Sequence, residues 1–307
     1  MAIPNQFKSI SVIMLALSMI ALSCKEVVEE PELSGIRLSA YISNLDYNDF
    51  PMMGKNAEIG IYVTEEGTDK VINDYSNLKF DAKFKTGVIQ LSSDFPIYYP
   101  QNGSLVDIVG YYPYNNELTA VDPYYSVDLS DQNALSPETL LLAKTSGSNS
   151  VLNKALLSLK LAYAKLNISV KLSEDTPNAA DMPITLRLNE IASSAKLNVL
   201  SGEYKSLESK ESVLLPVTQT SAHSHVATVI PQTLTEGAEI IVEYVASDKV
   251  QSQSVKIIEH IGAFEMNKQY DIDVLVSAQG VKAELVNVTD LYISDWNEDS
   301  EIITDKI

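Results

Sequence analysis

Few residues in this sequence have the types and spacing that support chemistry. His223 and His225 are two residues apart, so on a strand both would point to one face and could share a metal ion. A complete site needs further ligands, and neither a third histidine nor a cysteine lies nearby in the sequence. Asp271 and Asp273 have the same spacing and could form the carboxylate pair of a glycosidase, but alternating acids are also typical of an exposed sheet face. The sequence therefore predicts neither a metal site nor a cofactor.

Other signatures of catalysis are missing from the sequence. It contains no Gly-x-Ser-x-Gly turn, no phosphate-binding loop and no dinucleotide fingerprint. Trp296 follows Asp295 and could be a platform for a sugar ring, although a lone tryptophan more often anchors packing. Tyrosines are concentrated between Tyr98 and Tyr125, where they alternate with valine and isoleucine, so most should pack in the core or at its rim. We therefore predict that the protein is not an enzyme.

The only cysteine, Cys24, follows an apolar run over residues 10–22 that is preceded by Lys8. A basic start, an apolar stretch of about 7–15 residues and a small residue at the cut are the layout of a secretory signal peptide. The run is shorter than the roughly 20 residues that cross a bilayer. A cysteine at the cut predicts cleavage by a lipoprotein signal peptidase and lipidation of Cys24. We expect residues 1–23 to be the signal peptide and residues 24–35 to be an acidic tether.

Charge and length narrow the class of protein. The 307 residues carry a net charge of −19 at pH 7, and such an acidic surface argues against nucleic-acid binding. With Cys24 lipidated, no thiol remains for a disulfide, a zinc–thiolate site or a nucleophile, so packing must stabilise the fold. Removing the signal peptide leaves 284 residues (307 minus 23), which predicts two domains of ordinary length.

Apolar and polar residues alternate along many short segments, which is the period of a β-strand. Turn signals such as Glu66-Gly67-Thr68 and Ser201-Gly202 separate these segments. The pattern predicts an all-β chain of antiparallel sandwiches. One short helix is predicted at residues 136–141, where Ser136 can cap Pro137. The alternating segments are residues 36–42, 57–63, 184–188, 240–244, 270–276 and 281–285.

The segment from Leu159 to Leu172 is too long for a typical strand. Its apolar residues move from odd to even positions, which predicts a bulge near Ala164, because one extra residue exchanges the two faces. Just before it, residues 144–150 are the most linker-like stretch of the interior. We therefore predict an N-terminal β-sandwich domain over residues 36–150 and a C-terminal one over residues 151–307.

Several segments, spread along nearly the whole chain, occur in a distinctive order. They include Ala57-Glu-Ile-Gly-Ile-Tyr62, Ile97-Tyr-Tyr-Pro100, Val106-Asp-Ile-Val-Gly-Tyr-Tyr-Pro-Tyr114, Val229-Ile-Pro-Gln-Thr-Leu234 and Ile293-Ser-Asp-Trp296. Taken in this order, these segments resemble the fimbrillin-like lipoproteins of Bacteroides and related bacteria, the type V pilins. The resemblance implies two transthyretin-like antiparallel β-sandwich domains in tandem, without catalysis.

The resemblance also implies a function. Members are pilus subunits, or tip and anchor accessories, exported as lipoproteins to the outer-membrane surface and assembled into fimbriae. For this chain it implies attachment through lipid on Cys24, other pilin subunits as partners, and a host or bacterial surface ligand if the protein takes part in adhesion. In polymerising members a surface protease cuts after an arginine and releases the N-terminal strand. The emptied groove then accepts a strand of the next subunit, since that strand supplies both backbone partners and apolar side chains.

The chain departs from this plan in its arginines. The loop over residues 43–55 has none, and the only two in the chain are Arg37 and Arg187. Arg37 begins the first predicted strand and is the candidate maturation site, but a cut there would leave most of that strand in place. This favours an anchor, tip or other accessory pilin over a repeating stalk subunit. The alternative function is a surface glycan-binding lipoprotein of a polysaccharide-uptake system.

Overall fold

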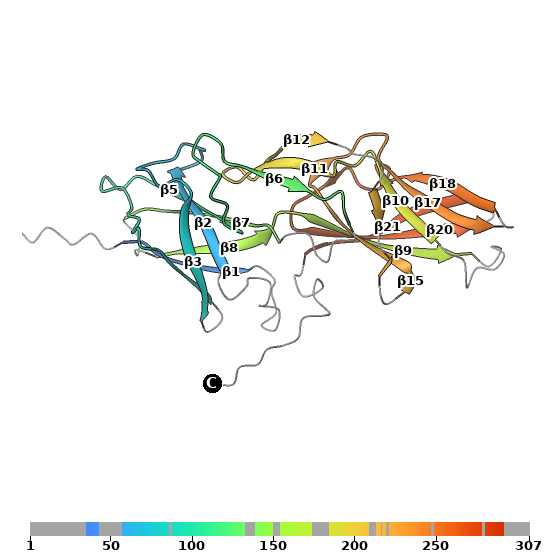
Figure 1. Cartoon of the computed structure of the whole chain (residues 1–307), viewed down its shortest axis with the longest axis horizontal. Coiled ribbons are helices and arrows are strands. Elements are labelled where there is room, and N and C mark those ends of the chain that lie inside the picture. Colours follow the sequence, from blue (N-terminus) through green and yellow to red (C-terminus); the bar gives the residue numbers. More distant parts are fainter. Residues whose placement is uncertain are drawn as a thin grey trace, which may run out of the picture. The chain divides into compact units, whose positions relative to one another are not determined.

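A computed structural model of the chain is shown in Figure 1. Cys24, the predicted signal peptide, residues 24–34 of the tether and Trp296 lie outside the part of the chain that it describes. Within the described part the regular elements are all strands, which confirms the all-β prediction, and no helix there is long and apolar enough to cross a membrane. The described residues are 35–42, 57–85, 88–132, 139–149, 154–173, 184–208, 213–215, 217–218, 221–246, 249–277 and 280–291.

Seven strands close into a barrel in the order β1-β4-β3-β2-β5-β7-β8. All neighbours in the barrel are antiparallel except β1 and β8, which are parallel. The inward side chains of these strands form the first hydrophobic core. The strands are β1 (Arg37–Ile42), β2 (Ala57–Glu65), β3 (Leu78–Lys85), β4 (Val88–Ser92), β5 (Val106–Tyr112), β7 (Leu141–Gly147) and β8 (Lys154–Leu161).

Two further sheets share a second core. Their orders are β13-β10-β17-β18 and β14-β15-β9-β20-β21, with β9 and β20 parallel. β16 (Gln232–Thr233) and β19 (Ala263–Phe264) form a separate two-stranded antiparallel sheet. The strands of the two sheets are β9 (Ala164–Leu172), β10 (Ile184–Asn189), β13 (Val213–Leu215), β14 (Val217–Thr218), β15 (Ser221–Val229), β17 (Glu239–Ala246), β18 (Lys249–Lys256), β20 (Lys268–Ser277) and β21 (Gly280–Asp290).

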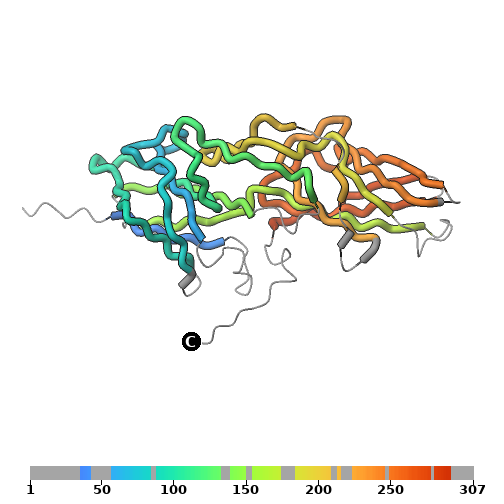
Figure 2. The backbone as a smooth tube through the Cα atoms, viewed as in Figure 1, coloured from blue at the N-terminus to red at the C-terminus, as the bar shows by residue number. Residues whose placement is uncertain are grey.

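The remaining sheet joins segments from distant parts of the sequence. It contains β6 (Tyr124–Asp128), β11 (Ser194–Asn198) and β12 (Tyr204–Glu208), in the order β12-β11-β6. Figure 2 shows the green β6 segment running beside the yellow β11 segment. Its inner side chains and the outward side chains of β2, β5 and β7 form a third core. This sheet therefore contains strands from both sides of the predicted domain boundary at residue 150. β8, which follows that boundary in the sequence, belongs to the barrel. The division into domains at residue 150 stays a prediction.

The long segment from Leu159 to Leu172 is two strands in two sheets, so the predicted bulge is wrong. β8 ends at Leu161 and β9 begins at Ala164. Leu159 faces the first core, whereas Leu166 faces the second. The change from odd to even positions therefore records the passage of the chain from one core to another.

The predicted helix is also wrong where it can be checked. Leu141 begins β7, and residues 133–138 lie outside the described part. Leu141 is fully buried in the first core and pairs with Tyr112 of β5. Burial and strand pairing outweigh a local helix signal of one or two turns.

The Ile59-Gly60-Ile61 segment of β2 shows why a glycine stands in a buried strand. Ile59 and Ile61 face the first core, and Gly60 faces outward, directly opposite Tyr111 of β5. A Cβ atom on Gly60 would lie 2.0 Å from Cε1 of the Tyr111 ring. The Tyr111 hydroxyl donates a hydrogen bond to Oδ1 of Asn77 at 2.6 Å, which holds the ring over the glycine.

We expect Gly60→Ala to lower the free energy of unfolding by about 1–3 kcal/mol, because the added methyl group overpacks against the Tyr111 ring. Urea denaturation measures this loss. Gly262→Ala is the matched control: nothing lies within 4 Å of a Cβ atom there, so its effect should stay within about 0.5 kcal/mol. Equal effects of the two substitutions would contradict the proposed role of the ring.

Candidate functional site

β1 closes the barrel between β4 and β8. Ala40, at its centre, lies opposite Ile89 of β4 in an antiparallel pair and opposite Leu157 of β8 in a parallel pair. Leu38, Ala40 and Ile42 alternate inward and are buried in the first core. The predicted first strand and its inward face are therefore confirmed. Because both edges of β1 are paired, its departure would leave two strands with unpaired backbone groups.

The opposite face of β1 begins with Arg37, the candidate maturation site. Arg37 is exposed and lies directly opposite Lys154, the first residue of β8. Like charges directly opposite each other destabilise a strand pair. Among the described residues neither cation forms an ion pair with a carboxylate. The pairing of Arg37 with Lys154 therefore contributes little to the hold of β8 on β1.

The residues before β1 are anchored to the segment that follows β4. The backbone N–H of Ile36 donates to the carbonyl of Ile97 at 2.8 Å. Ile36 and Ile97 are both buried in the first core. A Cβ atom at Gly35 would lie 3.4 Å from Cβ of Pro96, so the backbone passes close to that ring. These contacts fix the residues just before β1 in place, in addition to the pairing of β1 with β4 and β8.

Burial of the apolar face of β1 contributes a free energy that is large compared with the free energy of unfolding of a typical protein. Burying one leucine or isoleucine side chain contributes about 1.5–3 kcal/mol, so Ile36, Leu38 and Ile42 together contribute about 5–9 kcal/mol. Native proteins are stable by only about 5–15 kcal/mol in total. Loss of these side chains would therefore remove much of the stability of the barrel unless another segment takes their place.

The two histidines considered as metal ligands both lie on β15. His223 is half-buried and His225 is fully buried, opposite Ile168 of β9. In the described part of the chain, no three His, Cys, Asp or Glu side chains come together in a way that could hold a metal ion. The structure thus places both histidines in a sheet without bringing a third ligand to them.

The two aspartates considered as a glycosidase pair lie on β20 and are occupied by their neighbours. Asp271 accepts hydrogen bonds from Nδ2 of Asn167 at 2.9 Å and from Nε2 of Gln269 at 3.1 Å. Asp273 forms an ion pair with Lys171 of β9. Both carboxylates therefore belong to surface polar contacts between β9 and β20.

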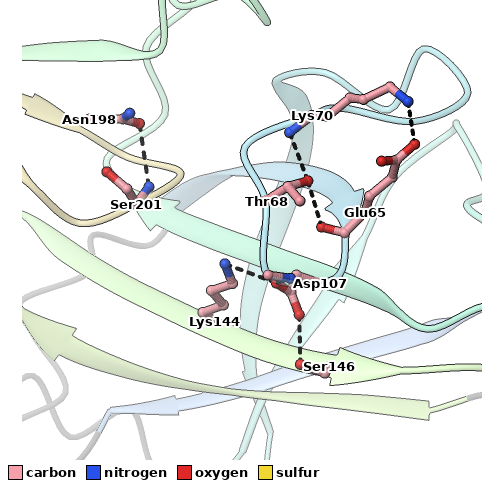
Figure 3. Close-up of polar contacts among 9 residues, drawn as sticks. Glu65, Thr68, Lys70, Asp107, Lys144, Ser146, Asn198 and Ser201 are labelled. Atoms are coloured by element: carbon pink, nitrogen blue, oxygen red, sulfur yellow. Dashed lines mark hydrogen bonds and ion pairs between the residues drawn. The ribbon is translucent and has the colours of Figure 1, made fainter.

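A buried carboxylate that the sequence analysis did not identify lies on β5. Asp107 is only 2% exposed, and it accepts hydrogen bonds from Oγ of Ser146 at 2.6 Å and from the backbone N–H of Gly67 at 2.8 Å. Its Oδ2 also lies 2.9 Å from Nζ of Lys144 (Figure 3). The available signal was an aspartate inside the apolar run from Val106 to Val109.

The contacts of Asp107 fit a structural role. Burial by itself raises the pKa of the carboxyl, but the hydrogen bonds it accepts outweigh burial and hold that pKa below its ordinary value. A carboxylate with a lowered pKa is a weak base, so it does not activate the hydroxyl of Ser146. It ties the turn after β2 to β5 and β7. Asp69 of that turn accepts a hydrogen bond from Nδ2 of Asn198 on β11 at 3.0 Å, which links the turn to the outer sheet.

We expect Asp107→Asn to lower the free energy of unfolding at pH 7 by about 1–3 kcal/mol, the value of hydrogen bonds to a charged group. A carboxyl whose folded-state pKa is lowered contributes stability above its unfolded pKa of about 3.9 and loses it as the pH falls through the folded value. The difference from wild type should therefore shrink when urea unfolding is measured below about pH 4.

Asp290→Asn is the matched control for this carboxylate. Its side chain is 57% exposed and pairs with Lys268, so the substitution should cost less at pH 7, because water screens the pair. A difference from wild type for Asp107→Asn that stays constant from pH 7 to the acid range would contradict the assignment.

Comparison with known proteins agrees with this architecture. The fold is similar to crystal structures of proteins assigned to cell adhesion from Bacteroides uniformis (TM-score 0.61, 21% identity, covering 85% of this chain and 99% of that chain) and Bacteroides ovatus (0.55, 16%, 84% and 98%). A fimbrial assembly protein from Parabacteroides distasonis is similar at a TM-score of 0.50, with 11% identity and coverage of 84% and 99%. At these identities the likeness shows the fold alone.

Sequence comparison gives the family. No curated protein matches the chain significantly. The sequence model of the fimbrillin-like family matches residues 48–296, which is most of the chain and includes nearly all the strands described above. This protein therefore belongs to the fimbrillin-like family.

Proposed function

We propose that this protein is a fimbrial subunit in an accessory, anchor or tip role. Lipid on Cys24 holds it on the outer-membrane surface until cleavage after Arg37 removes that residue, and it is assembled with other pilin subunits by strand addition at the position of β1. Its two tandem domains are transthyretin-like sandwiches. Membership of the fimbrillin-like family supports the fimbrial role. The observation that carries the mechanism is the place of β1, paired on both edges and buried along one face.

The groove that β1 fills specifies what a donor strand must look like. Leu38 and Ile42 are large, whereas Ala40 between them is fully buried opposite Ile89 and Leu157. A donor therefore needs a large, a small and a large apolar residue at alternate positions. Its backbone must also pair with both β4 and β8, because each would otherwise present an open edge.

Cleavage after Arg37 would weaken β1 without removing it. The cut would detach Ile36, with its buried side chain and its hydrogen bond to Ile97, which together contribute about 2–4 kcal/mol. It would leave Leu38, Ala40 and Ile42 in the barrel. The cut would also remove Arg37, which lies opposite Lys154. An incoming donor strand would then start at the new free end of β1, at Leu38, and displace the rest.

A disulfide between β1 and β4 tests whether β1 must leave. Ser39 and Gln90 are directly opposite in the antiparallel pair and lie on the outward faces of their strands. We expect the oxidised Ser39→Cys/Gln90→Cys variant to be absent from the sheared fimbrial fraction on immunoblots, and to enter it after treatment of the cells with dithiothreitol.

The Lys83→Cys/Gln90→Cys variant is the matched control. It uses the same cysteine on β4 but joins β4 to β3, since Lys83 is also directly opposite Gln90. We expect this variant to enter fimbriae whether oxidised or reduced. Oxidised Ser39→Cys/Gln90→Cys that assembles as well as this control would contradict strand exchange at β1.

The N-terminus of the protein tests the lipid anchor and the maturation site together. We expect mass spectrometry to find acylated Cys24 at the N-terminus of membrane-bound protein and Leu38 at the N-terminus of fimbrial protein. Cys24→Ser should release the protein from the membrane fraction. Fimbrial protein that begins only at Cys24 would contradict cleavage after Arg37, and continued membrane association of Cys24→Ser would contradict the lipid anchor.

A further inference from the structure

A surface groove of about 420 Å³ lies over the ends of β3 and β4 and is separate from the place of β1. Its lining includes the aromatic residues Phe95 and Tyr114 and the carboxylates of Asp81 and Asp94. Phe95 is 69% exposed, the most exposed aromatic side chain in the described part of the chain. Single exposed apolar residues are common on protein surfaces. What distinguishes Phe95 is that its ring borders a concave site with polar groups around it.

Phe95 belongs to a short backbone segment that hydrogen bonds and burial fix on both sides of the residue. The backbone N–H of Phe95 donates to Oγ of Ser93 at 3.2 Å. Two residues later, Ile97 is buried in the first core and its carbonyl accepts the N–H of Ile36. The next N–H, of Tyr98, donates to the Tyr75 hydroxyl at 3.2 Å. An exposed ring on an anchored backbone is a preorganised contact surface, which lowers the entropic cost of binding.

The polar groups of the groove favour a ligand rich in hydroxyl groups. Asp81 and Asp94 form neither a hydrogen bond nor an ion pair with other described residues, so their oxygens can accept hydrogen bonds from a ligand. Lys79 is paired with Glu58 at 2.8 Å, and its charge is therefore already balanced. Among the described residues that line the groove, the only cation is Lys79, which is paired with Glu58 and also lies in the field of Asp81. The two carboxylates of the lining therefore disfavour phosphate, sulfate and acidic sugars.

We propose that this groove binds a neutral saccharide. The apolar face of a sugar ring would pack on the exposed ring of Phe95, and its hydroxyl groups would donate to Asp81 and Asp94. Sites of this kind are concave, with an aromatic wall and a few polar groups that fix the orientation of the ligand. The inference goes beyond assembly, because no residue that lines the groove belongs to β1.

The test is binding of the full-length protein to an array of neutral oligosaccharides, followed by calorimetric titration with the strongest ligand. We expect a dissociation constant in the millimolar range or tighter, which corresponds to at least about 4 kcal/mol of binding free energy. Phe95→Leu keeps an apolar side chain but removes the ring, and should weaken binding at least about tenfold, as expected for an aromatic anchor. Phe95→Tyr keeps the ring and should bind within about twofold of wild type.

Two further variants separate the groove from the rest of the surface. Asp94→Asn should weaken binding, because a neutral amide is a poorer acceptor than a carboxylate. Val121→Ala changes a side chain that is 91% exposed and does not line the groove, and should leave binding unchanged. Lack of binding to every neutral glycan, binding to acidic glycans or basic peptides alone, or equal binding by Phe95→Leu and wild type would each overturn the proposal.

The proposal can fail independently of strand exchange. If both are right, Phe95→Leu enters fimbriae normally, and the oxidised Ser39→Cys/Gln90→Cys variant binds the saccharide as wild type does. Loss of saccharide binding in the oxidised variant would overturn the separation of the groove from β1.

Discussion

The pairing of β1 with β4 and β8 is the contact on which the rest of the barrel depends. One six-residue strand supplies backbone partners to both neighbours and buries Leu38, Ala40 and Ile42 in the first core. The same strand continues from Ile36, whose hydrogen bond to Ile97 fixes the segment that follows β4. Because this burial contributes a large share of the stability of an ordinary domain, departure of β1 is costly unless another strand takes its place.

One side of the barrel, here called the braced side, is covered by another sheet, whereas side chains on the opposite side are exposed to solvent. On the braced side, β2, β5 and β7 are covered by the sheet of β6, β11 and β12, with Tyr111 packed over Gly60 and Asp107 holding the turn after β2. On the other side, the outward faces of β1 and β8 carry Tyr41 and Leu156, which are 41% and 51% exposed. Opening the barrel at β1 would therefore leave its braced side intact, as a subunit that accepts a new strand requires.

The sequence predicted the individual strands more readily than it predicted which sheet and which core each strand joins. The alternation over residues 36–42 predicted both β1 and its buried face, because a period of two directly records which side faces a core. The same rule could not show that Leu159 and Leu166 serve different cores, since a bulge and a change of sheet shift the pattern alike. Asp107 and Phe95 escaped prediction because their roles depend on partners distant in sequence, such as Ser146, or on the shape of a surface.

Hydrogen–deuterium exchange of the intact protein tests most directly whether β1 is the strand that can leave. Backbone amides exchange through local or global opening reactions, whose free energies lie between zero and that of global unfolding. If β1 is exchangeable, the amides of residues 38–42 will exchange through an opening that leaves β2 and β5 protected. Protection of β1 equal to that of β2 and β5 would show that the barrel opens only as a whole, and would contradict strand exchange at this position.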